Sequence, residues 1–402
     1  MNILGVLPLK QIRTGGDRRY LELMELLAER GNSVFVIMNA WLEYTPLHFT
    51  KIALPVSYTP HGFPPGSFLF KKVIKKNLSL SLEFARNKGC AAFDIIHIHG
   101  DMFLKSALFL RKKLRIPLFY ASRCNDIDRA HIMRSKGALS SKEYFFSFVY
   151  EAINRFREKQ TAKYAELITF QNTVDRDIFL KRTKCAVEKT VIIPGNIGLP
   201  RCAPGWENRN KSDKLKNIVY IGALSPSKGI CDLLKALKRI KEKGYKLHCY
   251  VLGRIENASQ TMELIERLDI KDRISIEGFK NPFSYLADCD LMVYPTLYDA
   301  YPDAVLEALH TGCPVIASAV GGLPDMLKRP ELLFEAGDVE EIAHRMERCI
   351  KESEFYERIR SLCAERAQAH RFDWAEQFEK AMRKALAPQV SSLPILTKSD
   401  NL

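Results

Sequence analysis

Short apolar runs alternate with longer helical patterns along almost the whole chain. An apolar run of about four to eight residues indicates a buried strand, whereas apolar residues three or four positions apart indicate a helix packed on a sheet. The runs occur at residues 3–7, 34–37, 95–98, 118–120, 167–170 and 191–193, and again at 218–221, 247–252, 274–276, 291–294, 315–317 and 332–334. This alternation predicts an α/β fold in which mostly parallel strands are joined by crossover helices.

A polar stretch between the two sets of runs predicts a domain boundary. Residues 200–213 are punctuated by Pro200, Pro204 and Gly205, which suits a linker. The 402 residues are enough for about two domains of roughly 150–200 residues each. We therefore predict Rossmann-like, doubly wound domains at residues 1–200 and 212–372. Ligands of such sheets bind at the loops that follow the strands.

The first residues and the cysteines indicate a reducing compartment. Residues 1–6 read as a strand and lack the basic region and long apolar stretch of an export signal. No apolar run reaches the roughly 18 residues that cross a bilayer. The ten cysteines include no CxxC pair, and no His/Cys group has the spacing of zinc ligands. We expect a cytoplasmic protein without a disulfide framework or a metal site.

The net charge of +14 favours an acidic partner, namely nucleic acid, anionic lipid or a phosphorylated substrate. No helix-turn-helix, zinc-finger or RNP motif is present, so nucleic acid is not expected. Basic clusters at residues 71–76 and 111–115, the first preceded by apolar residues 68–70, suit a peripheral contact with an anionic membrane. A solvated helix face is the simpler explanation of both clusters, and the sequence leaves both interpretations open.

The segment with the most chemical content joins the run at 291–294 to a helical pattern that starts near Pro302. Asp299 lies in the loop, and Glu307 lies about two turns into the helix. A helix N-terminus offers unpaired N–H groups and positive potential, which suit an anion. Ionised carboxylates accept hydrogen bonds from the vicinal hydroxyls of a sugar or ribose. On spacing alone, an N-cap acid followed by a surface glutamate is the simpler interpretation.

The same segment resembles the E-x7-E signature of the retaining GT-B glycosyltransferases of family 4 (group 1), a family similar to bacterial cell-surface polysaccharide enzymes. Members usually read EGFPNxxxEA, and this chain reads DAYPDAVLEA at residues 299–308. The resemblance implies that Asp299 contacts hydroxyls of the donor hexose and that Glu307 contacts the nucleotide ribose. Asp299 replaces the usual glutamate and is shorter by one methylene.

Two neighbouring segments extend the resemblance. GCPVIAS at residues 312–318 and GGLPD at 321–325 are similar to the family's GxPVIAS and GGxPE stretches, in which paired glycines permit close backbone approach. GALSPSKG at residues 222–229 is similar to its G-R-L-x-x-x-K-G. By this resemblance Lys228 meets the donor diphosphate as a point charge, while Ala223 stands where the family has an arginine.

Two residues have both a donor-binding and a plainer interpretation. Arg254 follows another strand and can supply the charge that Ala223 lacks, although a solvated arginine is the simpler interpretation. Phe279 follows a strand whose loop contacts the base in family members, and a core phenylalanine is the alternative. The donor-binding residues implied by the resemblance are Gly15, Gly16, Gly222, Lys228, Phe279, Asp299, Ala300, Tyr301, Pro302 and Glu307.

The N-terminal domain carries further matches. Gly15-Gly16 resembles the family's glycine-rich first loop, and DIIHIHG at residues 94–100 resembles its DxxHxHG strand end. His97 and His99 share one face of that strand, where packing or substrate contact is simpler than metal ligation. Arg123 stands where many members carry a sugar-contacting histidine, and it suits a phosphate or an acidic acceptor. The catalytic residues implied are Asp299, Lys228, Arg123 and His99.

The resemblance implies a metal-independent, retaining hexosyltransferase without a cofactor, which uses a nucleotide diphosphate sugar and a cell-surface glycan or lipid-linked acceptor. Its N-terminal domain is the acceptor side, and a closing helix at residues 375–388 packs back on it. Two DxD matches, at 126–128 and 288–290, are interpreted as chance. The alternatives are an inactive GT-B scaffold, motivated by Ala223 and Asp299, and a nucleotide-sugar epimerase, which the run at 299–325 argues against.

Overall fold

The computed structural model describes all residues except 8, 10, 13, 55–78, 81, 88, 90, 91, 198–214, 255–257 and 388–402. The predicted linker at 200–213 and the basic cluster at 71–76 lie outside the described residues. The chain divides into two compact units. The first comprises Met1–Asn125, Val149–Ile193 and Asp373–Leu402, and the second comprises Asp126–Phe148 and Pro194–Phe372.

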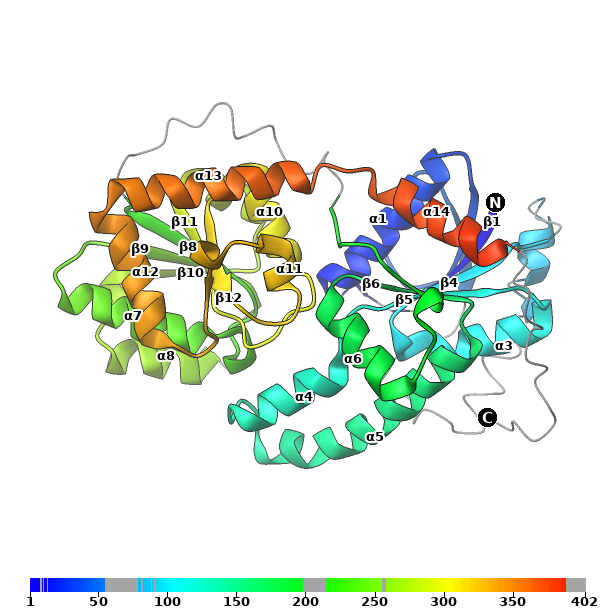
Figure 1. Cartoon of the computed structure of the whole chain (residues 1–402), viewed down its shortest axis with the longest axis horizontal. Helices are drawn as coiled ribbons and strands as arrows, with labels where there is room; N and C mark the ends of the chain where they lie inside the picture. The colour runs from blue at the N-terminus through cyan, green and yellow to red at the C-terminus, as the bar shows by residue number, and fades with distance from the viewer. Residues whose placement is uncertain are drawn as a thin grey trace. The chain divides into compact units, whose positions relative to one another are not determined.

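The first unit is built on a parallel sheet of seven strands, in the order β3-β2-β1-β4-β5-β6-β7 (Figure 1). Its strands are β1 (Asn2–Leu7), β2 (Ser33–Asn39), β3 (Thr50–Leu54), β4 (Ile95–His99), β5 (Leu118–Ala121), β6 (Leu167–Phe170) and β7 (Thr190–Ile192). Its helices include α1 (Gly15–Glu29), α3 (Leu104–Leu114), α6 (Thr173–Thr183) and α14 (Trp374–Leu386). The long helix α5 (Ser141–Tyr164) begins in the second unit and continues in the first.

The second unit is built on a parallel sheet of six strands, in the order β10-β9-β8-β11-β12-β13. Its strands are β8 (Asn217–Ile221), β9 (His248–Leu252), β10 (Ile274–Gly278), β11 (Leu291–Tyr294), β12 (Val315–Ser318) and β13 (Leu333–Phe334). Its helices are α4 (Asp126–Ser135), α7 (Ile230–Glu242), α8 (Ala258–Arg267), α9 (Pro282–Asp288), α10 (Asp303–Thr311), α11 (Leu323–Leu327), α12 (Val339–Lys351) and α13 (Ser353–Ala369). The predicted architecture of two doubly wound α/β sheets is confirmed.

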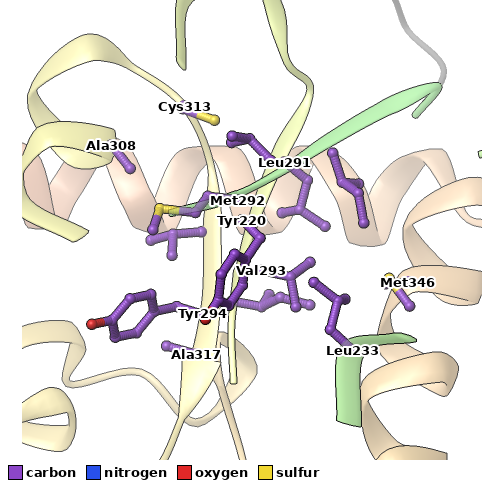
Figure 2. Packing of buried hydrophobic residues seen from close by; sticks show 14 of the residues in the cluster. Tyr220, Leu233, Leu291, Met292, Val293, Tyr294, Ala308, Cys313, Ala317 and Met346 are labelled. Atoms are coloured by element: carbon purple, nitrogen blue, oxygen red, sulfur yellow. The ribbon is translucent and has the colours of Figure 1, made fainter. Parts of the chain in front are cut away.

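Apolar packing on both faces holds the second sheet. The central strand β11 is buried at every position, as expected for a parallel strand covered by helices on both sides. Figure 2 shows Leu233 of α7 and Met346 of α12 on one side of the strands and Ala308 of α10 on the other. Each fully buried leucine or methionine contributes about 1.5–3 kcal/mol relative to an exposed one. This core fixes the strand ends from which the loops of the candidate site leave.

Helix α14 packs on α1 and β6 within the first unit. Its N-cap is Asp373, whose side chain accepts a hydrogen bond from Glu376 N at 2.8 Å. Arg30, at the end of α1, donates to Glu379 at 3.0 Å and to Asp373 at 2.5 Å. The last helix is thus attached to the first sheet by packing and by a small ionic network.

The described part of the chain contains no helix long and apolar enough to cross a membrane. Its eight described cysteines are free thiols. Three or more His, Cys, Asp or Glu side chains never come together there in a group suited to a metal ion. In the basic cluster at 111–115, Arg111 is buried and its Nη2 lies 2.7 Å from Glu166 Oε1, so this arginine is not available to an external anion.

His97 lies in the core of the first unit. Its ring stacks on Tyr20 at 5.2 Å between centroids and also contacts Phe119 and Phe378. Neither ring nitrogen has a hydrogen-bond partner among the described residues. Burial lowers the pKa of His97 to about 3, because the charged ring would lose its hydration. His97 therefore packs in the core, as the packing interpretation predicts, and its ring is neutral at physiological pH.

We predict that wild-type stability falls as the pH drops below about 6.5, the ordinary histidine pKa. Below that pH His97 binds a proton in the unfolded chain but stays unprotonated in the folded protein. The loss attributable to His97 is about 1.4 kcal/mol per pH unit between the unfolded and folded pKa values. The variant His97→Leu removes this contribution of His97 to the pH dependence of stability. Urea unfolding of both proteins from pH 8 to pH 4 measures the difference, and a wild-type minus variant difference that does not change with pH contradicts the prediction.

Candidate active site

The carboxyl ends of the strands in the second sheet form the edge that carries the predicted donor residues. From β8 the chain proceeds outward to β9 and β10, and then returns to β11 on the other side of β8. Ligands of open parallel sheets bind where the strand order reverses in this way. Lys228 lies in the loop after β8 and Asp299 in the loop after β11, so the two residues come from the two strands that flank the reversal.

Backbone contacts join these two loops to each other and to the loop after β12. Leu297 N donates to Ser227 O at 3.0 Å, and Gly322 N donates to Asp299 O at 3.0 Å. Gly229 has a φ of +72°, and a Cβ there would lie 1.8 Å from Pro295 O. A Cβ at Gly321, where φ is +55°, would lie 2.0 Å from Asp299 O. Glycine is needed at both positions because backbone from another loop occupies the space of a side chain.

Lys228 and Asp299 form an ion pair at the centre of this edge. Lys228 Nζ lies 2.6 Å from Asp299 Oδ2, and the two side chains are 30% and 19% exposed. The Tyr294 hydroxyl donates to the same Oδ2 at 2.9 Å. The Tyr220 hydroxyl donates to Ala223 O at 2.8 Å and to Lys228 O at 3.2 Å, which fixes the loop that carries the lysine. The site thus combines a lysine, a carboxylate and two buried tyrosines.

Helix α10 begins beside this cluster. Pro302 is its N-cap and makes no side-chain cap hydrogen bond, so the first turn keeps its positive end. Glu307 is the fifth residue of α10, just over one turn in, and is buried, with 3% of its surface exposed. Burial, together with the negative charges of Asp299 and Glu307, raises the pKa of Tyr294 well above its ordinary value. Tyr294 therefore remains a neutral hydroxyl that donates to Asp299.

Other predicted donor residues take different positions along this edge. Phe279 directly follows β10 and is 82% exposed, so the core-phenylalanine alternative is wrong. Ala300 and Tyr301 are buried, and the Tyr301 hydroxyl lies 2.7 Å from His370 Nε2. The Tyr301 side chain therefore packs into the core, and only its backbone lies in the loop. Arg254 is exposed, and its carbonyl accepts from Leu224 N at 2.9 Å.

The site residues predicted in the first unit also gather at strand ends. Arg123, after β5, donates to Asp17 Oδ1 at 2.8 Å and to Thr14 Oγ1 at 2.6 Å. Thr14 caps α1, whose first residues are Gly15 and Gly16, and a Cβ at Gly16 would lie 2.7 Å from Arg123 Nη2. The glycine thus leaves room for the guanidinium to cover the first turn of α1.

His99 ends β4 in the same unit. Its Nδ1 is buried without a hydrogen-bond partner among the described residues. Burial, followed by the positive charge of Arg123, lowers its pKa well below the ordinary value. The ring is therefore a neutral imidazole. The structure places His99 and Arg123 in the first unit, whereas Lys228 and Asp299 belong to the second.

Comparisons with known proteins show what this chain resembles. Residues 206–365 match the family model described as "Glycosyl transferases group 1". The uncharacterized glycosyltransferase MJ1059 of Methanocaldococcus jannaschii is 28% identical over 46% of this chain and 47% of its own, so the chain spans about half of that relative. Residues 206–365 thus resemble the group 1 glycosyltransferases.

Two more comparisons extend over most of the chain. The N-acetyl-alpha-D-glucosaminyl L-malate synthase of Bacillus anthracis is 23% identical over 83% of this chain and 84% of its own. The crystal structure of HepE of Anabaena in complex with UDP and glucose superimposes with a TM-score of 0.69, at 17% identity, over 95% of this chain and 99% of that one. The fold is GT-B, as predicted.

The DxD match at 288–290 has a structural explanation. Asp290 Oδ2 accepts hydrogen bonds from Lys216 N and Asn217 N, each at 2.9 Å, where β8 and β11 begin. It therefore lies at the amino ends of the strands, whereas Lys228 and Asp299 lie beyond their carboxyl ends. Asp288 is the last residue of α9.

Sequence reasoning missed Tyr294 as part of the site. A tyrosine at the end of a buried strand reads as core, and the side chain is indeed 4% exposed. One feature of the sequence did point to a site residue: Tyr294 directly precedes Pro295, where the strand ends and the loop to Asp299 begins.

We predict that Gly229→Ala costs roughly 2–5 kcal/mol of unfolding free energy, because it adds overpacking to the strain of a left-handed backbone. The matched control is Gly244→Ala in the same unit. Gly244 has a φ of +83°, and no atom lies within 4 Å of the place that an added Cβ would take, so only the roughly 1–2 kcal/mol of backbone strain applies. Urea unfolding measures both. Equal losses in the two variants would show that the contact with Pro295 is unimportant.

Proposed function

We propose that this protein is a group 1 glycosyltransferase. It is a metal-independent, retaining enzyme that moves a hexose-type sugar from a nucleotide diphosphate sugar to a cell-surface glycan or lipid-linked acceptor. The observation that carries the proposal is the Lys228–Asp299 ion pair of 2.6 Å between the loops of β8 and β11. A cation and a carboxylate, held side by side at the reversal of the strand order, suit the two parts of a sugar diphosphate.

Lys228 is proposed to bind the diphosphate. The lysine stands at the end of a short 3-10 turn, two residues before the first residue of α7, and Pro302 opens α10 nearby in the same sheet edge. When the donor binds, the ammonium group exchanges Asp299 for phosphate oxygens. The N-terminal N–H groups of α7 and α10 add positive potential at the same edge. These groups stabilise the charge that develops on the leaving diphosphate.

Asp299, Glu307 and Phe279 are proposed to bind the rest of the donor. Asp299 accepts hydrogen bonds from sugar hydroxyls, while the Tyr294 hydroxyl orients its carboxylate by donating a hydrogen bond to Oδ2. Glu307 accepts from the ribose hydroxyls after a small opening of its buried site. Phe279 supplies an exposed aromatic face on which a base stacks. HepE was crystallised with UDP and glucose, so UDP-sugars are the first donors to test.

The transfer reaction is proposed to proceed with retention at the anomeric carbon. The bond between that carbon and the diphosphate oxygen breaks, and the nucleoside diphosphate leaves with the electron pair. The acceptor hydroxyl attacks the same face, and its proton passes to the departing phosphate. His99 and Arg123 are proposed to bind the acceptor or the donor from the first unit. The DxD pair takes no part, because Asp290 is bound to backbone at the amino edge of the sheet.

We predict that nucleoside diphosphates raise the melting temperature of the wild type and that Lys228→Ala weakens their binding about 10–100-fold, the effect of losing one or two charged hydrogen bonds. Calorimetric titration with UDP, GDP and ADP measures the affinity. Lys235→Ala, which removes a lysine that is 50% exposed on α7, is the matched control and keeps wild-type affinity. Unchanged binding in Lys228→Ala would refute the diphosphate role.

We predict that Tyr294→Phe lowers kcat roughly tenfold or more while nucleoside diphosphate affinity stays within about twofold, because the lost hydrogen bond orients Asp299 rather than the phosphates. Asp299→Asn, which changes the sugar-binding group itself, gives a larger loss of kcat. Turnover is followed as release of UDP from UDP-sugars in the presence of EDTA. A Tyr294→Phe variant with wild-type kcat, or an activity that EDTA abolishes, contradicts the corresponding part of the proposal.

The alternative function is a non-catalytic scaffold with this fold. Ala223 and Asp299 motivate it, because the first removes a usual cation and the second already neutralises Lys228. A scaffold gives neither nucleotide binding nor donor hydrolysis. The acceptor screen includes L-malate, since the Bacillus anthracis relative is named for that acceptor, together with lipid-linked sugars. Transfer to malate alone would overturn the proposed acceptor class and leave the donor site intact.

A further inference from the structure

Helix α5 exposes an unusual number of large apolar side chains. Within 13 residues of this helix, seven such side chains are between 44% and 69% exposed: Tyr144, Phe145, Phe146, Phe148, Val149, Tyr150 and Phe156. Single exposed apolar residues are normal on a protein surface, but a contiguous apolar patch marks an interaction site. The group is therefore a candidate docking surface.

The helical spacing sorts these residues into one stripe. Phe145, Phe148, Val149, Ala152 and Phe156 follow the spacing i, i+3, i+4, i+7 and i+11, which keeps them on one side of the helix. All five are exposed. We call this set the α5 stripe. Its aromatic residues carry most of the exposed apolar surface.

Lysines lie on the same side of the helix at both ends of the α5 stripe. Lys142 precedes Phe145 by three positions, and Lys159 and Lys163 follow Phe156 by three and seven positions. All three lysines are exposed. Arg134 of α4 adds a further cation, with its guanidinium 4.5 Å from the centre of the Phe148 ring.

The carboxylates of α5 lie off this side. Glu143 accepts hydrogen bonds from Ser140, and Glu151 pairs with Arg155 at 2.7 Å. Glu158 pairs with Arg182 of α6 at 2.6 Å, so that side of the helix faces the body of the first unit. The exposed side of α5 therefore presents aromatic rings and lysines without carboxylates of its own.

We propose that the α5 stripe docks the enzyme on an anionic phospholipid bilayer. The aromatic rings enter the interface between headgroups and acyl chains, while Lys142, Lys159 and Lys163 contact lipid phosphates. This chemistry favours a bilayer over a second copy of the chain, because two such lysine-flanked sides repel each other. The docking is independent of sugar transfer, since no stripe residue belongs to the proposed donor site.

The test is flotation of the full chain with vesicles of phosphatidylcholine, with and without phosphatidylglycerol. We expect binding to the anionic vesicles that falls with salt, and little binding to the neutral ones. Phe145→Ser/Phe156→Ser should weaken binding about tenfold or more by removing two interfacial rings. Lys142→Gln/Lys159→Gln should weaken binding about fivefold per lysine on anionic vesicles.

The matched control is Tyr150→Ser, an equally exposed aromatic that lies away from the stripe, and it should bind vesicles like the wild type. Melting temperatures and UDP-induced shifts, which should equal the wild type, verify that each variant is folded. The proposal is overturned if the wild type ignores anionic vesicles, binds neutral ones equally, or is unaffected by the two double variants. A dimer in sedimentation that Phe145→Ser/Phe156→Ser dissociates, without vesicle binding, assigns the surface to a second copy instead.

Discussion

The candidate site depends on the close approach of three loops, which follow the neighbouring strands β8, β11 and β12. Gly229 and Gly321 leave no room for a side chain, because Pro295 O and Asp299 O occupy those positions. A loop that passes within van der Waals contact of another cannot shift freely, so the backbone of Lys228 and Asp299 is held at neighbouring positions, from which the side chains form the ion pair of 2.6 Å. The parallel sheet fixes the strand ends from which these loops leave.

The attraction within the Lys228–Asp299 pair is itself small enough to be exchanged. The two side chains are 30% and 19% exposed, and partly solvated pairs contribute only about 0–1 kcal/mol. A diphosphate offers the lysine more negative charge than one carboxylate does, so exchange toward a bound donor is favourable. In the proposed exchange Asp299 loses Lys228 as a partner, whereas the Tyr294 hydroxyl, which donates to Asp299 Oδ2 at 2.9 Å, can still orient the carboxylate. The tyrosine thus provides orientation that the shorter aspartate side chain would otherwise lack.

The sequence predicted most strands of both sheets, because buried parallel strands appear as continuous apolar runs. It also predicted that Lys228 and Asp299 lie in one site, because ligands of such sheets bind at the loops that follow the strands. Strand β3 (Thr50–Leu54) was not predicted, since an edge strand with polar residues lacks a continuous apolar run. Helix α13 was not predicted either, although its apolar residues are buried. Tyr301 and Phe279 show the limit for side chains, because burial is decided by which distant element covers them.

The exposure of the positively charged side chains is likewise decided by the tertiary structure. A net charge of +14 indicates an acidic partner but does not say which surface meets it. The cluster at 111–115 contains Arg111, which the fold buries against Glu166. A run of basic residues in the sequence therefore does not by itself indicate exposed positive charge. On α5 the helical period alone separates Lys142 and Lys159 from the carboxylates, and the tertiary structure then decides that the lysine side is exposed. A surface is therefore identified by charge and exposure together, and the α5 stripe meets both conditions.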